Sequence, residues 1–176
     1  MAITINGNGT LSGVTAGLTS SSMPTGSVLQ VVQTHVDSDI SSTGNDWDDL
    51  SGMTVAITPS ASSSKILFQT SVDWAGNTSA KLKFLVDIGG AGYNDLPLPS
   101  QDGNRIPAHL THNCYNNESD KGPRSYVYLH SPNTTSAVTY KTQMWGSGRI
   151  NWPGNNGNSS GYGQGTSTLT AWEIAG

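Results

Sequence analysis

Hydrophobic and polar residues alternate along most of the chain from residue 28 onward. The clearest case is the segment 82–88, where Leu82, Phe84 and Val86 alternate with the charged residues Lys83 and Asp87. A period of two residues is expected of a β-strand that buries one face and exposes the other. The same pattern predicts further strands at residues 28–33, 53–57, 66–74, 125–130, 138–145, 149–152 and 167–174.

Segments rich in Gly, Pro, Asn and Ser separate these predicted strands. No window combines a helical period of apolar residues with capping residues. Roughly seven to nine short strands with turn-rich connections are typical of an antiparallel β-sandwich or jelly roll. We therefore predict an all-β fold, with the sandwich spanning residues 27–176.

Residues 1–26 form a different kind of segment. Ile3 and Ile5 alternate with polar residues, and Gly, Ser and Thr then dominate up to Gly26. So little apolar surface does not offset the conformational entropy that folding would cost. We predict an extended N-terminal arm that attaches to another chain. Its candidate attachment residues are Ile3, Ile5, Leu11, Val14 and Leu18.

The composition narrows the class of partner. Charged residues make up 11% of the 176 residues, and the net charge is −4. Nucleic acids and anionic membranes require clustered Lys and Arg, so neither is an expected partner. No stretch approaches the ~20 apolar residues of a membrane-spanning helix. The first residues lack the pattern of a signal peptide, so we expect synthesis in a cytoplasm and no membrane insertion.

Carboxylates that could work as a pair are few, because the chain has only two glutamates, Glu118 and Glu173. The segments 37–39 and 46–49 each hold at least two aspartates. Paired carboxylates can hydrolyse glycosides or bind Ca²⁺. Neither segment has the spacing of an EF-hand loop, and Asp also favours turns. We interpret both as solvated loops between strands.

The segment 109–114 contains His109, His112 and Cys114, which are residue types that bind zinc. Their spacing does not complete a tetrahedral set, and on a strand the two histidines would face opposite sides. A polar loop with a buried thiol is the favoured interpretation, with a metal site as the alternative. No local motif supports a Ser/His/Asp triad. We therefore predict no catalytic residues, no bound metal and no cofactor.

Several aromatic residues fall in predicted polar loops beside Asn, Asp and Gly. Such rings suit sugar binding, because a ring stacks on a pyranose face while amides and carboxylates bind the hydroxyls. The alternative is that these rings cover the core or a subunit contact. The candidate glycan or receptor residues are Trp152, Asn155, Asn156, Tyr162, Tyr93 and Trp47.

Five segments together resemble a family of tailed-phage fibre and knob-like virion proteins, especially those of marine phages. The most specific match is 50–59 followed by 63–67, which reads LSGMTVAITP and then SSKIL. The residues 3–13 resemble the family's short attachment segment, and 23–31 resemble the entry into its globular head. The segments 131–141 and 167–174 complete the match. Residues 91–122 and 153–165 show none.

The resemblance implies a C1q- or TNF-like β-sandwich head that assembles as a homotrimer on a capsid, neck or tail. It also implies a virion component that is assembled in the host cytoplasm and contacts other virion proteins through the arm. It supplies no catalytic residues. The unmatched loops are where a surface that reads a host polysaccharide would vary.

The last predicted strand offers independent support for self-association. Leu169 and Ala171 have one parity, while Trp172 and Ile174 have the other. A strand that is apolar on both faces needs a second cover, which a symmetric partner can supply. The candidate trimer-interface residues are Leu169, Trp172 and Ile174.

Three functions remain open at this stage. A trimeric virion fibre, knob or decoration subunit is the favoured one. A free-standing carbohydrate-binding module is the second, and it predicts a monomer with affinity for glycans. A glycan hydrolase is the third, and it requires two aspartates about 5–9.5 Å apart across a cleft.

Overall fold

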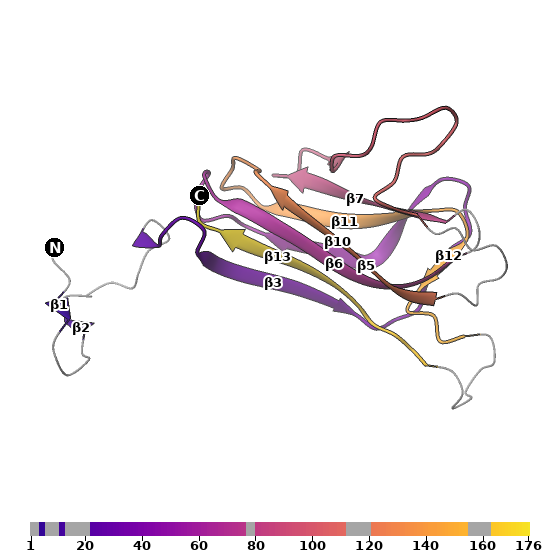
Figure 1. Cartoon of the computed structure of the whole chain (residues 1–176), viewed down its shortest axis with the longest axis horizontal. Coiled ribbons are helices and arrows are strands. Elements are labelled where there is room, and N and C mark those ends of the chain that lie inside the picture. Colours follow the sequence, from indigo (N-terminus) through magenta and orange to yellow (C-terminus); the bar gives the residue numbers. More distant parts are fainter. Residues whose placement is uncertain (1–3, 6–10, 13–21, 77–79, 112–120, 155–162) are drawn as a thin grey trace.

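A computed structural model describes residues 4–5, 11–12, 22–76, 80–111, 121–154 and 163–176. The strands from residue 28 onward are antiparallel and pack as two layers, while the two short strands of the N-terminal arm form a separate sheet (Figure 1). The strands are β1 (Thr4–Ile5), β2 (Leu11–Ser12), β3 (Val28–Val36), β4 (Ile40–Ser42), β5 (Trp47–Ile57), β6 (Lys65–Gly76), β7 (Lys81–Ile88), β8 (Tyr93–Asp95), β9 (Leu110–Thr111), β10 (Lys121–His130), β11 (Val138–Trp145), β12 (Gly148–Ile150) and β13 (Ser167–Ile174).

The first sheet has β13 between β3 and β6, and β10 pairs with β6 as well. The short strands β12 and β4 extend this sheet beyond β13 and β3. The second sheet has the order β5-β11-β7-β8, and β9 also pairs with β7. Successive long strands alternate between the two sheets along much of the chain, which is typical of a jelly roll. The predicted all-β antiparallel sandwich is confirmed.

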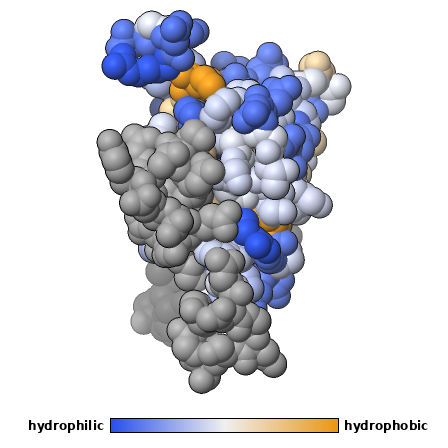
Figure 2. Space-filling view, turned by 90° about the vertical axis from the view of Figure 1, so that its right-hand side faces the viewer, coloured by the Kyte–Doolittle hydropathy of each residue, from blue (hydrophilic) through white to orange (hydrophobic). Residues whose placement is uncertain are grey.

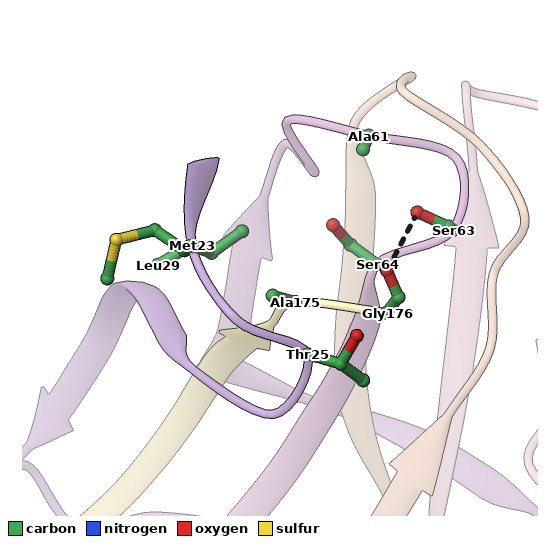
Figure 3. A pocket seen from close by; sticks show the side chains of 8 residues that line it. All are labelled: Met23, Thr25, Leu29, Ala61, Ser63, Ser64, Ala175 and Gly176. Atoms are coloured by element: carbon green, nitrogen blue, oxygen red, sulfur yellow. Dashed lines mark hydrogen bonds between the residues drawn. The ribbon is translucent and has the colours of Figure 1, made fainter. Parts of the chain in front are cut away.

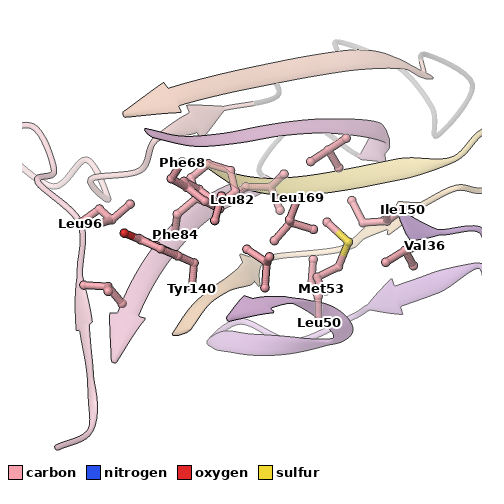
Figure 4. Close-up of a cluster of buried hydrophobic side chains, with 14 of the residues drawn as sticks. Val36, Leu50, Met53, Phe68, Leu82, Phe84, Leu96, Tyr140, Ile150 and Leu169 are labelled. Atoms are coloured by element: carbon pink, nitrogen blue, oxygen red, sulfur yellow. The ribbon is translucent and has the colours of Figure 1, made fainter. Parts of the chain in front are cut away.

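The core lies between the two sheets and is built from the inward positions of the alternating strands (Figure 4). Phe68 of β6 is stacked on Tyr140 of β11, with ring centroids 4.7 Å apart, and meets Phe84 of β7 edge-on at 5.6 Å. All three side chains are fully buried. Burying a large apolar side chain contributes about 1.5–3 kcal/mol, so these rings are a main source of the sandwich's stability.

The prediction that residues 46–49 form a loop was wrong, because β5 begins at Trp47. Lys141 of β11 pairs with Thr54, whereas Gln143 pairs with Asp49, so β5 contains extra residues at this point. Gly52 in this irregular stretch has a φ of +79°. A bulge of this kind interrupts the period of two, which is why the sequence pattern did not extend the strand back to Trp47.

A buried asparagine joins four segments at one end of the first sheet. Asn151 has a φ of +58°, a left-handed conformation that Asn tolerates better than most residues. Its backbone N–H donates to the carbonyl of Asp73 at 2.8 Å, and its Nδ2 donates to the carbonyls of Val36 at 2.8 Å and Ser38 at 3.1 Å. Its Oδ1 accepts from the Ser167 hydroxyl at 2.7 Å. Asn151 is therefore a fully satisfied polar link between β3, β6, β12 and β13.

A buried glutamate has the same linking role at the other end of β13. Glu173 is fully buried, and its Oε1 accepts from the backbone N–H and hydroxyl of Ser60 and from the hydroxyl of Ser64, at 2.6–2.7 Å. Its Oε2 accepts from Nε2 of Gln30 at 2.6 Å. Burial raises the pKa of Glu173, but these hydrogen bonds outweigh that effect and hold the pKa below its ordinary value.

Residues 22–26 lie against the C-terminal end of the chain. The N–H of Gly26 donates to the carbonyl of Ala175, and the N–H of Ala175 donates to the carbonyl of Ser27, both at 2.8 Å. In the arm, Thr4 pairs with Ser12 and Ile5 with Leu11 through their backbones.

None of the described residues belongs to a helix with the length and apolar character needed to span a membrane.

Candidate functional site

The outer face of the first sheet carries a band of apolar side chains across four strands. Strand register places Val31 beside Trp172, Trp172 beside Leu67, and Leu67 beside Leu129. Val31 and Leu129 are 47% and 49% exposed, while Leu67 and Trp172 are half-buried. We call this surface, with its neighbours on the same face, the apolar band. Its members are Val28, Val31, Leu67, Val127, Leu129, Trp172 and Ile174.

Strand β10 forms one edge of the apolar band, and its pattern is unusual. Its aliphatic residues Val127 and Leu129 face outward, whereas the tyrosines Tyr126 and Tyr128 face the core side. Val127 is 55% exposed. A sheet with one solvated face normally places its polar residues outward. Four of the five exposed large hydrophobic residues of the described chain lie on this one face, which makes it the candidate interaction surface.

Two of the three predicted interface residues lie in the apolar band. Trp172 and Ile174 are on the outer face, but Leu169 is fully buried in the chain's own core, so its side chain is not available to a partner. The alternation correctly predicted apolar residues on both faces of β13. It was wrong to count Leu169, on the inner face, as an interface residue. Val31, Leu67, Val127 and Leu129 were missed, because their meeting depends on strand order rather than on any local pattern.

The outer face of the second sheet has a different chemistry. Trp47 of β5 pairs with Trp145 of β11, and both side chains face outward and are half-buried. The Lys81 ammonium lies 4.1 Å from the Trp145 ring centroid, and the Lys83 ammonium lies 4.6 Å from that of Trp47. Tyr93 of β8 lies under the Lys141 ammonium at 4.0 Å. We call this surface the aromatic face. It consists of Trp47, Asp49, Lys81, Lys83, Asp87, Tyr93, Asp95, Lys141, Gln143 and Trp145.

Polar side chains on the aromatic face are held in place by one another. Nζ of Lys141 and Nε2 of Gln143 both donate to the Asp49 carboxylate, at 2.9 Å and 2.7 Å. The hydrogen bond from Lys141 is the main reason why the pKa of Asp49 lies below its ordinary value. Lys83 forms an ion pair with Asp95 at 3.0 Å. Because these side chains are anchored, the face presents fixed donors and acceptors beside its rings.

A hollow opens beside the aromatic face. It has a volume of about 510 Å³ and is lined by Lys81, Asn104, Arg105, Ile106 and Thr111. A smaller hollow of about 240 Å³ lies against the same loop. Figure 2 shows this end of the molecule, where a hydrophilic lobe projects at the top above a small hydrophobic patch. The lobe is part of the loop between β8 and β9, which lies at the top of Figure 1.

The six candidate glycan residues do not come together in loops as the sequence predicted. Trp152 is only 5% exposed, so its ring is not available as a stacking platform. Trp47 and Tyr93 do not lie in loops but on strands of the aromatic face. Asn155, Asn156 and Tyr162 lie outside the described residues. The sequence showed that Trp145 and Lys83 occupy alternating positions on their strands. It did not show that both lie on the same face of the same sheet.

His109 is held by contacts with the residues around it. Its Nδ1 accepts a hydrogen bond from the Phe84 N–H at 3.0 Å, and its ring packs edge-on against Tyr126 at 4.8 Å. Burial lowers the pKa of His109. His112 and Cys114 lie outside the described residues. Among the residues that the structure describes, no three His, Cys, Asp or Glu side chains are grouped as metal ligands would be.

A third hollow lies where residues 22–26 meet the C-terminal end (Figure 3). It has a volume of about 320 Å³ and is lined by Met23, Thr25, Leu29, Ala61, Ser63, Ser64, Ala175 and Gly176. Apart from Met23 and Leu29, its lining consists of small residues, and we interpret it as the junction between the arm and the head. Of the predicted attachment residues, only the backbones of Ile5 and Leu11 are described; Ile3, Val14 and Leu18 lie outside the described residues.

The fold and these surfaces define a jelly-roll-like β-sandwich with one apolar and one aromatic outer face. No protein-family model and no curated protein matches the chain. Among solved structures, the chain is similar to the infectious bursal disease virus VP2 subviral particle, with 12% identity and a TM-score of 0.40 over 84% of this chain and 38% of that one. It is also similar to infectious bursal disease virus of the Gx strain, with 12% identity and a TM-score of 0.39 over 85% of this chain and 39% of that one. The chain thus spans less than half the length of these proteins.

Proposed function

We propose that this chain is a structural subunit of a tailed-phage virion and that it assembles as a homotrimer through the apolar band. The observation that carries the trimer is the in-register row formed by Val31, Trp172, Leu67 and Leu129 across one outer sheet face. The virion role rests on the resemblance of five sequence segments to tailed-phage fibre and knob proteins. The subunit acts as a fibre, knob or decoration on head, neck or tail, and not as an enzyme.

The composition of the apolar band favours a protein partner over solvent. Its centre contains aliphatic residues and a tryptophan, while Lys65 and Asp73 are charged positions toward the ends of β6 on the same face. Aromatic enrichment and depletion of charge at the centre are typical of subunit interfaces. Val31 and Leu129 lie on the two outermost strands of the row and are 47% and 49% exposed. Complete burial of each by a partner would therefore contribute roughly 1 kcal/mol, about half of the value for a fully exposed side chain.

The free edge of β10 also favours self-association. Within the described chain, β10 pairs only with β6, and it is a long strand with exposed Val127 and Leu129. A long, apolar edge strand is normally covered, because it otherwise promotes aggregation. A trimer with a C1q- or TNF-like arrangement would cover both this edge and the apolar band, which is why we favour three subunits. The arm at residues 1–26 would then attach the trimer to another virion protein.

The decisive experiment is the solution mass by light scattering. A trimer has a mass three times the 18.4 kDa of the chain. Leu129→Glu places a charge on the apolar band at its edge strand β10 and should yield monomers. Ser51→Glu, at an exposed position on the other sheet, is the matched control and should leave the mass unchanged. A monomeric wild-type chain would refute the trimer and favour the carbohydrate-binding module, for which the aromatic face is the supporting observation.

The attachment role of the arm needs a separate test in particles. Deletion of residues 1–21 retains residues 22–26, which are hydrogen-bonded to the head through Gly26. The truncated protein should fold and keep its oligomeric mass but fail to enter virions. Normal incorporation of the truncated protein would contradict the attachment role.

A further inference from the structure

The aromatic face is the second unusual surface of the molecule, and the trimer does not use it. We infer that this face binds a neutral polysaccharide, with Trp47 and Trp145 stacking on pyranose rings. Asp49, Gln143 and Lys83 would bind the hydroxyl groups. The inference adds a ligand to the proposed virion role, on which its biological meaning rests, but the binding itself depends only on the surface of the single subunit.

The arrangement of the rings fits a chain of sugars. Trp47 and Trp145 are directly opposite each other on neighbouring strands, and Tyr93 lies at the far end of the same face. Tyr93 pairs with Asp87, which pairs with Thr139, and Thr139 is six residues from Trp145 along β11. At about 3.3 Å per residue, the face is roughly 20 Å long. That length accommodates several sugar units rather than one.

The polar groups of the face are of the kinds that bind hydroxyls. The Asp49 carboxylate is exposed and accepts hydrogen bonds, while Gln143 and Lys141 are fixed beside it by their contacts with that carboxylate. Sugar hydroxyls both donate and accept, so a site needs both kinds of partner close to an apolar platform. Fixed side chains lose little entropy when the ligand binds, which increases affinity.

The charge of the face selects the ligand class. Its charged members are three lysines and three aspartates, so the formal charges cancel. They are Lys81, Lys83, Lys141, Asp49, Asp87 and Asp95. Lys83 is paired with Asp95, and Lys141 with Asp49. Arg105, which lines the neighbouring hollow, is paired with Asp102. An acidic polysaccharide would need an excess of positive charge, so a neutral one fits better.

The hollow beside Lys81 extends the site. Its volume of about 510 Å³ and its mixed lining of Asn104, Arg105, Ile106 and Thr111 provide a concave end to an otherwise flat face. Lys81 belongs to both surfaces, because its ammonium also lies over Trp145. A polysaccharide that stacks on the tryptophans would therefore reach this hollow without leaving the protein surface.

The test is affinity electrophoresis of the full chain in gels that contain a soluble neutral polysaccharide. Hydroxyethyl cellulose, xyloglucan and galactomannan serve as neutral probes, and alginate as the acidic one. Trp145→Ala removes half of the platform, and Gln143→Ala removes a donor at a half-exposed position with little effect on folding. Thr135→Ala, at an exposed position of the loop between β10 and β11 and outside both faces, is the control for a general surface change. A thermal melt of each variant monitors its fold.

We expect at least one neutral probe to retard the wild-type chain and the Thr135→Ala variant. The same probe should bind the Trp145→Ala and Gln143→Ala variants about tenfold more weakly. Retardation by alginate alone, by no probe, or equally for wild type and both aromatic-face variants would each overturn the inference. The Leu129→Glu variant separates this result from the trimer. Because this variant is expected to be a monomer, its binding of the probe shows whether the glycan site depends on assembly. If the wild-type chain is itself a monomer but binds the neutral probe, the trimer is refuted and the glycan site stands.

Discussion

Glu173 offers a sharp test of how the sandwich is held together, because one buried carboxylate links three parts of the chain. It joins β13 to the β5–β6 loop through Ser60 and Ser64, and to β3 through Gln30. Glu173→Gln keeps the shape of the side chain and removes its charge. Glu173→Ala removes all four of its hydrogen bonds and leaves buried donors without partners.

The structure sets the size of the effect. A hydrogen bond to a charged group contributes about 1.5–3 kcal/mol, but bonds that share one carboxylate do not add independently. The cost of desolvating the buried carboxylate also reduces their sum. We expect a loss of about 2 kcal/mol for Glu173→Gln and about 4 kcal/mol for Glu173→Ala. In a chain of this length, each kcal/mol lowers the Tm by about 2–4 °C.

The pH dependence provides a second, independent readout. The pKa of Glu173 in the folded chain lies below the ordinary value of 4.5. Its stabilising contribution is therefore complete above pH 4.5 and is lost as the pH falls through the lower folded pKa. The stability difference between wild type and Glu173→Gln should be largest at pH 7 and should shrink on acidification below pH 4.5.

The assay is urea unfolding at several pH values and one fixed protein concentration, because self-association would also contribute to stability. Asp102→Asn is the matched control, since it makes the same chemical change in an exposed ion pair and should cost less than about 1 kcal/mol. Equal stability of wild type and Glu173→Gln at pH 7 would refute the reasoning. A difference between them that does not change with pH would also contradict it.

Three further predictions follow from particular contacts. Asn151→Ala should lower the free energy of unfolding by about 3 kcal/mol, because it leaves buried groups without hydrogen bonds and strains a left-handed backbone. Asn133→Ala, at an exposed position of similar φ, is the control and should cost clearly less in the same urea assay. Burial lowers the pKa of His109 and of His130, so stability should be complete above about pH 6.5 and should fall as the pH drops toward their folded pKa values. His109→Gln should flatten that slope only in part, and an unchanged slope would contradict the role of His109. In hydroxyl-radical footprinting of the assembled protein, Trp172 should be protected and Trp47 should react; the reverse order would exclude the apolar band as the interface.

The strands of the core were predictable because their chemistry is local. Leu82, Phe84 and Val86 alternate with polar residues, and the structure buries the inward positions as the period of two requires. The pattern failed where the backbone departs from that period. The bulge around Gly52 interrupts the alternation, so the first half of β5 was not predicted as a strand. The short strands β8 and β9 contain too few apolar residues to show an alternating pattern.

The two outer faces were only partly predictable, because each is assembled from strands that are distant in the sequence. Trp172 was recognised from the double parity of the last strand, but its neighbours Val31 and Leu67 become neighbours only once the sheet order is fixed. In the same way, Trp47 was a candidate glycan residue but was assigned to a loop. Its strand partner Trp145 was not among the candidate glycan residues, because the pairing of the two rings depends on the register of β5 and β11.

The contrast between the two faces would allow the proposed assembly and the proposed polysaccharide binding to occur on one small domain. An apolar face with few charges is stable only when it is covered, whereas a face of rings and paired charges can remain in water because its polar groups are already satisfied. The two faces lie on opposite layers of the sandwich, so covering one leaves the other free. A trimer built on the apolar band would therefore present three copies of the aromatic face. Weak binding of a polysaccharide at each copy would then be strengthened by multivalency, provided that one polymer reaches more than one site.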